Sequence, residues 1–390
     1  MKRFFACLLC AAVPVATACT TGTETTGGDA GARDDGGATG TDDAGDAGAE
    51  AGAGLLGFRP SNLDNSPDLE PTLAEELGDL VLSDCGPQVD ANDEGRAGCD
   101  PPGGVYRRID GHDGAGQKYV VYVARNIRVA EGKTLTVARG DRPVILVALD
   151  TIEVAGGIFV PPGTAGGFSP ADPPDGQGPG AGKGSSASTS GSGGGGAFCG
   201  KGGNGGAPTA TGGEPYGSPE IIPLQGGSSG GGLFAAKGGG AIQLVAGREI
   251  IVASEGFIDV PGDGAVTGGG AGGAILLEAP VVKVAGSLTA NGGSGGAPGG
   301  QDGKRGDRSS TPAPGATNAQ SINGGNGGAG TQVDGTDGVT NASSPEAEGS
   351  ASGGGGAGWI RINTRSGSAE ITGLVSPDLS TACATQGTLR

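Results

Sequence analysis

A short apolar module returns five times along the chain. Each copy contains three short runs in which every second residue is apolar, a pattern that predicts β-strands with one buried face. A module of this size cannot bury its apolar face alone, so the copies are expected to stack on one another. The copies span Tyr119–Val137, Val144–Val160, Ala241–Val260, Ala274–Ala290 and, in degraded form, Trp359–Leu374.

Alignment of the copies places similar residues in columns, and three strands in roughly 24 residues correspond to one coil of a parallel β-helix. We therefore predict an all-β fold, a right-handed parallel β-helix (solenoid), with the columns as its core. Helical periodicity is confined to Leu73–Leu82. The columns contain Ile127, Ile152, Ile250 and Val282; Val129, Val154, Val252 and Val284; Leu135, Ile158, Ile258 and Leu288; Val137, Val160, Val260 and Ala290; and, in the leading strands, Val121, Ile145, Ile242, Ile275 and Ile360.

Two long glycine-rich inserts, at about 163–240 and 292–358, separate some of the copies. Both fall between the third strand of one coil and the first strand of the next, so we expect glycine-rich loops that leave one edge of the solenoid. Ordering so much glycine is costly in conformational entropy, which favours mobile loops. Extended glycine segments can also pack side by side where side chains would prevent it. Because Phe168, Phe198 and Tyr216 could pin the first insert, we expect partial order there and disorder in the second.

The N-terminal residues predict export. Lys2 and Arg3 precede a short apolar stretch, and small residues follow it directly before Cys19, so residues 1–18 are predicted to be a signal peptide. The sequence before Cys19 resembles the lipobox of bacterial lipoproteins, which implies lipidation of that cysteine and, since Thr20 follows, the outer membrane or cell surface. Cleavage after Ala18 without lipid is the alternative.

The charge is concentrated near the N-terminus. The chain carries a formal net charge of −18, and residues 20–100 hold 19 acidic against 3 basic residues. Residues 19–54 are almost entirely small and acidic, which predicts a disordered tether, and residues 55–118 are expected to cap a solenoid over 119–390. The expected partners are the membrane, through the anchor, and surface polysaccharide or another cell-surface protein. The sequence has no basic stripe that could hold phosphates, so nucleic acid is not expected as a partner.

Four cysteines remain once Cys7 and Cys10 leave with the signal and Cys19 takes lipid. An even number in an exported chain indicates disulfides. Cys85 and Cys99 bracket a short polar loop and form the natural first pair. Elimination then leaves Cys199 and Cys383. These four cysteines include no Cys-x-x-Cys pair, so no metal site and no cofactor are predicted.

Candidate chemistry is sparse. Hydrolysis of a polysaccharide needs two facing carboxylates, and the outward columns place none on neighbouring coils, where Arg128 and Glu153 instead predict a surface ion pair. The sequence Asp110-Gly111-His112-Asp113 could supply a base, although a polar loop is the simpler interpretation. Residues 327–338 weakly resemble a calcium-binding repeat. Loop residues that could serve an enzyme are Asp172, Asp175, Asp302 and Asp307.

The signal, the tether and modules such as GGGAIQLVAGREIIV and GGAILLEAPVVKVAG together resemble glycine-rich bacterial surface lipoproteins with a β-solenoid body. This resemblance covers residues 1–54 and the modules from 119 onward. It implies an exported solenoid and carries no activity. The sequence favours a non-enzymatic, lipid-anchored surface protein with a structural or adhesive role. A carbohydrate-active β-helix enzyme with a site built by the loops is the alternative.

Overall fold

The computed structural model describes residues 54–63, 77–82, 88–90, 106–112, 116–171, 173–185, 192–341, 343 and 349–390. All of them belong to one compact unit, Ala49–Arg390. Its fold is all-β, since every regular element in the described part is a strand apart from the short 3-10 turn η1 (Gly54–Leu56). The stretch Leu73–Leu82 is not helical at its end, because Asp79–Leu82 forms strand β1.

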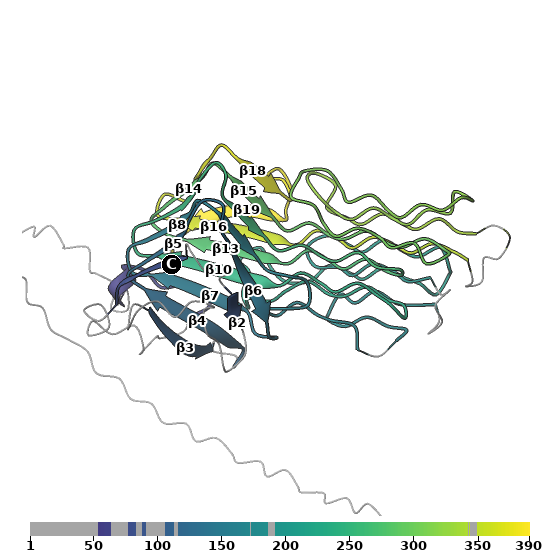
Figure 1. Cartoon of the computed structure of the whole chain (residues 1–390), viewed down its shortest axis with the longest axis horizontal. Coiled ribbons are helices and arrows are strands. Elements are labelled where there is room, and N and C mark those ends of the chain that lie inside the picture. Colours follow the sequence, from purple (N-terminus) through teal and green to yellow (C-terminus); the bar gives the residue numbers. More distant parts are fainter. Residues whose placement is uncertain are drawn as a thin grey trace, which may run out of the picture. The chain divides into compact units, whose positions relative to one another are not determined.

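Three sheets of almost entirely parallel strands make up the body (Figure 1). Sheet A consists of β1, β5 (Asn126–Val129), β8 (Thr151–Val154), β11 (Glu249–Val252), β14 (Val281–Val284) and β17 (Glu370–Ile371). Sheet B consists of β2 (Gln88–Asp90), β6 (Thr134–Arg139), β9 (Gly157–Phe159), β12 (Phe257–Asp259), β15 (Ser287–Thr289) and β18 (Leu374–Ser376). Sheet C consists of β3 (Tyr106–His112), β4 (Lys118–Ala124), β7 (Val144–Ala148), β10 (Ala241–Ala246), β13 (Ala274–Glu278), β16 (Trp359–Thr364) and β19 (Ala384–Thr388).

Each module supplies one strand to sheet C, one to sheet A and one to sheet B, in that order. In the second module these strands are β7, β8 and β9, and each pairs in parallel with the equivalent strand of the next module. The degraded fifth module follows the same order through β16, β17 and β18. The prediction that the modules stack as three-stranded coils is therefore confirmed.

The predicted core columns of sheets A and B are confirmed. Ile152 pairs with Ile127 on one side and with Ile250 on the other, and Ile250 pairs in turn with Val282. In sheet B, Ile258 pairs with Ile158 and Leu288. The side chains in these columns are buried and belong to one apolar cluster between the sheets. Like side chains thus stack above one another along the solenoid.

The predicted register of sheet C is wrong at one step. Ile145 pairs with Gln243, and Ile242 pairs with Val144. The physical reason is that sheet C is buried on both faces. Every residue of β7 and of β10 is buried, so apolar residues stand on both sides and alternation cannot fix which ones face inward.

The outer face of sheet C is covered by two segments distant in sequence. Leu56, Phe58 and Leu63 pack there from residues 54–63, and Ile221 and Leu224 pack there from the first insert. This second apolar cluster explains why the leading strands are apolar without alternation.

Every long connection runs from sheet B to sheet C. Residues 160–240 join β9 to β10, residues 260–273 join β12 to β13, and residues 290–358 join β15 to β16. We call these three segments the glycine bundle. Their chains run back and forth side by side, away from the sheets (Figure 1). The expectation of disorder in the second insert is wrong, because its backbone is hydrogen-bonded throughout the described residues.

The hydrogen bonds of the glycine bundle have a three-residue period. In the run 350–358 the backbone N–H groups of Ala351, Gly354 and Ala357 donate to the run 332–340. Those of Ser352, Gly355 and Gly358 donate to the run 290–297, and those of Gly353 and Gly356 donate to the run 192–197. A left-handed helix with three residues per turn and no internal hydrogen bonds, of the polyproline II type, directs its donors in this way.

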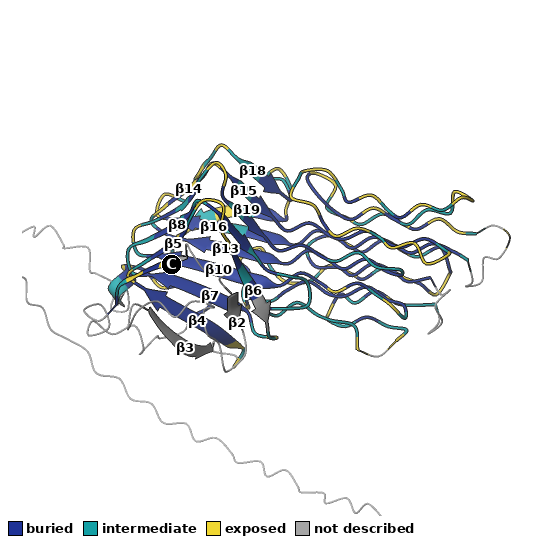
Figure 2. Ribbon diagram, in the orientation of Figure 1, coloured by how far each residue is buried: buried dark blue, intermediate teal, exposed yellow. Residues whose placement is uncertain are grey.

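Interior runs of the glycine bundle have six neighbours each. The run 350–358 donates to the three runs just named and accepts hydrogen bonds from the runs 200–206, 268–273 and 323–329. Five runs are buried along their length and contain only Gly, Ala and Ser, except for Asn291 (Figure 2). These interior runs are 192–197, 226–231, 268–273, 290–297 and 350–358.

Close approach of neighbouring backbones makes glycine obligatory inside the glycine bundle. A Cβ atom on Gly354 would overlap the carbonyl oxygen of Asn326, and one on Gly355 would overlap that of Gly270. Hydrogen bonding in three directions offsets the entropy cost of ordering glycine, because almost every buried peptide group finds a partner. This balance is the reason that the inserts are ordered.

Candidate functional site

The turns of the glycine bundle gather at one end. The residues that flank them are hydrogen-bonded across runs, as in Gly206 N to Ala351 O and Ser352 N to Gly296 O. The opposite ends of the runs lead into the strands of sheets B and C. We call the end formed by turns 207–210, 232–235, 264–267, 298–300 and 318–322 the turn end.

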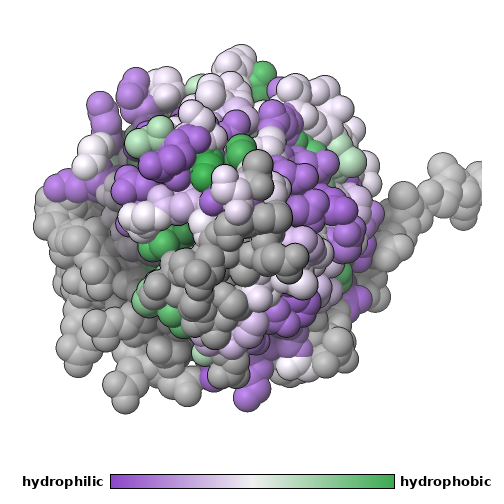
Figure 3. All heavy atoms as spheres, turned by 90° about the vertical axis from the view of Figure 1, so that its right-hand side faces the viewer, coloured by the Kyte–Doolittle hydropathy of each residue, from purple (hydrophilic) through white to green (hydrophobic). Residues whose placement is uncertain are grey.

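Several exposed side chains lie at the turn end of the glycine bundle, among them Pro208 and Thr209. Figure 3 faces it and shows mainly hydrophilic and near-neutral residues with a few separate hydrophobic spots. Two large apolar side chains of this part are solvent-exposed, Phe234 at 54% and Val339 at 44%. Exposed apolar side chains among polar ones give the turn end both kinds of group that a partner can contact.

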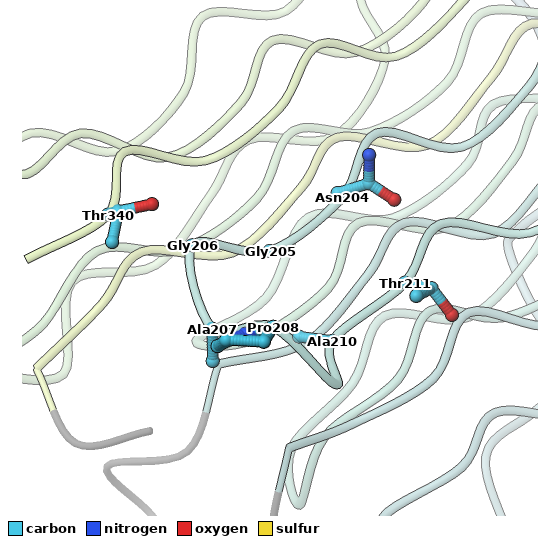
Figure 4. A pocket seen from close by; sticks show the side chains of 8 residues that line it. All are labelled: Asn204, Gly205, Gly206, Ala207, Pro208, Ala210, Thr211 and Thr340. Atoms are coloured by element: carbon cyan, nitrogen blue, oxygen red, sulfur yellow. The ribbon is translucent and has the colours of Figure 1, made fainter. Parts of the chain in front are cut away.

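An open pocket of about 440 Å³ lies at the turn end. In Figure 4, Thr340 lies on one side of Gly205 and Gly206, and Asn204 and Thr211 lie on the other. The turn Ala207–Ala210 closes the pocket below in this view. None of the lining residues is ionisable: Asn204, Gly205, Gly206, Ala207, Pro208, Ala210, Thr211 and Thr340.

The charged side chains nearest this pocket in sequence are paired. The carboxylate of Asp337 accepts from the backbone N–H of Asn204 at 2.7 Å and from its side-chain amide at 3.5 Å. Lys201 forms a 2.9 Å ion pair with Glu214, which raises the pKa of the lysine. Asn204 is held further by its Oδ1 atom, which accepts from Gly212 N. The pocket therefore presents neutral polar groups.

A second polar cluster lies where run 301–308 of the glycine bundle crosses sheet B. The guanidinium of Arg305 lies 5.0 Å from the ring centre of Phe159, and that of Arg308 lies 3.8 Å from the ring centre of Phe257. Asp259, only 5% exposed, accepts a 2.6 Å hydrogen bond from the hydroxyl of Thr289. Cation–π contacts thus clamp the run against the sheet over a buried carboxyl group.

Burial raises the pKa of Asp259 to about 6, although the hydrogen bond from Thr289 and the charges of Arg308 and Arg305 oppose the shift. Burial likewise raises the pKa of the half-buried Asp263. Perturbed carboxyl groups often mark functional sites, but ion-pair networks that clamp a structure perturb them as well. Here the two arginines lie over phenylalanine rings, so the cluster fastens the glycine bundle to the solenoid.

Three of the four acidic residues predicted for an enzyme lie in the described part of the chain, and each interacts with a different group. Asp175 forms a 2.9 Å ion pair with Lys183 within the first insert. Asp302 and Asp307 lie on run 301–308, where their charges act on the pKa of Asp263 and Asp259 respectively. Asp172 lies outside the described residues.

Three further predictions from the sequence concern an ion pair, a possible base and a possible calcium site. Arg128 and Glu153 form the predicted surface ion pair at 3.2 Å. Asp110–His112 belongs to strand β3, which pairs antiparallel with β4, so the expected polar loop is a strand there. Residues 327–338 belong to two neighbouring runs in which Asp334 accepts from Lys201 N, and no cluster of three metal-ligating side chains occurs among the described residues.

One of the two predicted disulfides is present. Cys199 and Cys383 are bonded, with Cα atoms 5.6 Å apart and a sequence separation of 184. The bond joins the first insert to the segment between β18 and β19, where Cys383 is buried. Cys19, Cys85 and Cys99 lie outside the described residues.

Sequence reasoning missed the order of the glycine bundle. The available signal was a three-residue spacing of side chains on its outer runs, as in Lys201 and Asn204, or Asp334, Asp337 and Thr340. Residues three apart lie on the same side of a helix with three residues per turn, so this spacing exposes them together.

Searches with family models, among curated proteins and among solved structures found no match for this chain. Within the described ranges, no helix has the length and apolar character needed to cross a bilayer.

Proposed function

We propose that this protein is a non-enzymatic adhesin of the cell surface, anchored in the outer membrane by lipid on Cys19 and exposing the turn end of its glycine bundle to a partner. The observation that carries the proposal is the convergence of the turns, with their exposed side chains, at one end of a hydrogen-bonded bundle. We also propose that the solenoid coils in the right-handed sense, which connections between parallel strands of one sheet overwhelmingly adopt.

The attachment of residues 54–63 supports a turn end that points away from the membrane. Leu56 lies beside Gly247, which follows β10, whereas the glycine bundle joins sheet C at the opposite, N-terminal ends of its strands. In Figure 1 these residues (purple) lie on the side of the sheets away from the turns. A tether leading into residues 54–63 would therefore hold the turn end outward.

Polar contacts fix residues 54–63 firmly. Glu278 accepts hydrogen bonds from the backbone N–H and hydroxyl of Ser61, and also from the amide groups of Gln243 and Asn363. Asn62 donates to Ile221 O at 3.0 Å and accepts from Leu224 N at 3.0 Å. The segment is thus bound both to sheet C and to the first insert, as a surface protein that bears load through its tether requires.

The engagement of the carboxylates supports a non-enzymatic role. Glycoside hydrolysis uses two carboxyl groups that flank the scissile bond. Asp175 is paired with Lys183, Asp334 accepts from Lys201 N, and Asp337 accepts from Asn204. Asp259 is buried under run 301–308. The described part of the glycine bundle therefore favours binding over hydrolysis.

Adhesion of cells that display the full chain tests the proposal. Phe234→Ala together with Val339→Ala should lower adhesion severalfold, because both side chains are exposed in the glycine bundle. Val281→Ala is the matched control, since Val281 is 44% exposed but lies on β14 of the solenoid. The proposal would be refuted if cells with the unaltered chain, the double variant and the Val281→Ala control all adhered no better than cells without the protein. Polysaccharide turnover by the purified full chain would also refute it.

A further inference from the structure

The pocket at the turn end has the chemistry of a site for a neutral carbohydrate. Its volume of about 440 Å³ falls within the range of small-molecule sites. Its lining combines hydroxyl and amide groups of Thr211, Thr340 and Asn204 with the small apolar surface of Ala207, Pro208 and Ala210. Sugars offer the same combination, since their hydroxyl groups both donate and accept and their C–H groups form apolar patches.

The polar groups that line the pocket are available to a ligand. Within the described residues, the hydroxyl groups of Thr211 and Thr340 take part in no hydrogen bond, and both residues are exposed. A hydroxyl group can donate once and accept twice. The amide of Asn204 is oriented by Gly212 N on its oxygen, and its nitrogen makes only the long 3.5 Å contact with Asp337. The pocket thus holds donors and acceptors that a ligand can reach, with the Asn204 amide already oriented.

Charge excludes an ionic ligand. No ionisable side chain lines the pocket. Nearby, Lys201 is paired with Glu214, and the Asp337 carboxylate is hydrogen-bonded to the neutral Asn204. An anionic sugar would meet the Asp337 carboxylate without a free cation to balance it. A cationic ligand would find no carboxylate in the pocket lining to balance its charge.

The support beneath the pocket is rigid. Gly205 N donates to Ala210 O at 2.6 Å, and Gly206 N donates to Ala351 O at 2.8 Å, so the turn is joined to interior run 350–358. Little conformational entropy is lost on binding to a preformed site. We infer that the turn-end pocket binds an uncharged glycan unit, and this inference rests on the proposed function because it names the partner of the same surface.

An array of neutral and acidic oligosaccharides probed with the full chain in detergent tests this inference. We expect binding to neutral glycans that persists in high salt, since no ion pair contributes. Thr211→Val combined with Thr340→Val keeps the side-chain shape and removes both hydroxyls, so binding should fall about tenfold or more. Thr331→Val is the matched control, because Thr331 is exposed and directly precedes the outer run 332–340.

The outcomes separate this inference from the proposed function. Binding only to acidic glycans, binding abolished by salt, or neutral binding unchanged in the double variant would overturn the glycan site. If cells displaying the chain adhere through Phe234 and Val339 but the array shows no glycan binding, the ligand class is wrong and the adhesive function stands. If neither adhesion nor glycan binding is observed, the proposed function and the glycan site are both overturned.

Discussion

The solenoid and the glycine bundle are two repeats in one chain, held together in opposite ways. In the solenoid, apolar side chains such as Ile152 and Ile250 stack between sheets, and the backbone bonds only along each sheet. In the glycine bundle the interior runs lack large side chains, and the backbone of each run bonds to six neighbours. The comparison shows that an interior can be held together by stacked side chains or, where side chains are small, by hydrogen bonds between closely packed backbones.

The largest expected effect comes from adding a side chain inside the glycine bundle. Gly355→Val would place its branched side chain where the carbonyl of Gly270 lies. Backbone cannot yield as a flexible side chain does, so we expect a loss at the upper end for overpacked interiors, more than about 5 kcal/mol. Thermal unfolding measures the loss. The exposed change Thr331→Val should leave the melting temperature unaltered, and a tolerated Gly355→Val would show that the runs are not closely packed.

Removing the disulfide should be the next most costly change. Cys199→Ser with Cys383→Ser opens a loop of 184 residues, for which the chain-entropy account gives about 5 kcal/mol. Chemical denaturation under oxidising and reducing conditions measures this. Reduction should destabilise the unaltered protein more than the double variant, in which only the predicted Cys85–Cys99 pair remains to be reduced. A variant as stable as the oxidised protein would mean that the bond fastens nothing.

A truncation inside the solenoid should cost somewhat less. Ile250→Ala removes buried methyl groups from the column of sheet A and leaves a cavity, with an expected loss of about 3 kcal/mol. The adjacent Ile251 points outward and is half-buried, so Ile251→Ala is the control and should cost much less. Similar losses in the two variants would contradict the assigned faces of β11.

The smallest expected effect is on the pH dependence of stability. Because burial raises the pKa of Asp259 to about 6, the folded protein binds more protons than the unfolded chain between about pH 4 and pH 6. Stability should therefore fall as pH rises through this window, by at most about 3 kcal/mol. Asp259→Asn should flatten the curve, whereas the exposed change Asp302→Asn should not. An unchanged slope in Asp259→Asn would contradict the burial of this carboxyl group.

Most of the solenoid could be predicted from the sequence, but little of the glycine bundle could. Period-two alternation placed Ile127, Ile152 and Ile250 correctly, because each faces a single core. It failed in sheet C, where Ile145 pairs with Gln243. There the inner face packs on the core and the outer face is covered by distant segments, so both faces are apolar. The segments that cover the outer face are distant in sequence, so the pattern within a strand does not predict them.

The glycine bundle escaped prediction because entropy was weighed without the hydrogen bonds that offset it. Deletion of most of 292–358 would seem harmless for a flexible loop. It would instead remove run 350–358, which has six bonded neighbours. The pocket was equally hidden, since Asn204, Thr211 and Thr340 meet only when three runs lie together. The Cys199–Cys383 bond was predictable by counting cysteines.

Amide hydrogen exchange tests the central claim most directly, because it reports the backbone hydrogen bonds of each run separately. We predict that the amides of interior runs 192–197, 268–273 and 350–358 exchange as slowly as those of β8 and β11. The turn 318–322 should exchange fast. Exchange of the interior glycine amides at the rate of that turn, while β8 and β11 stay protected, would contradict the account.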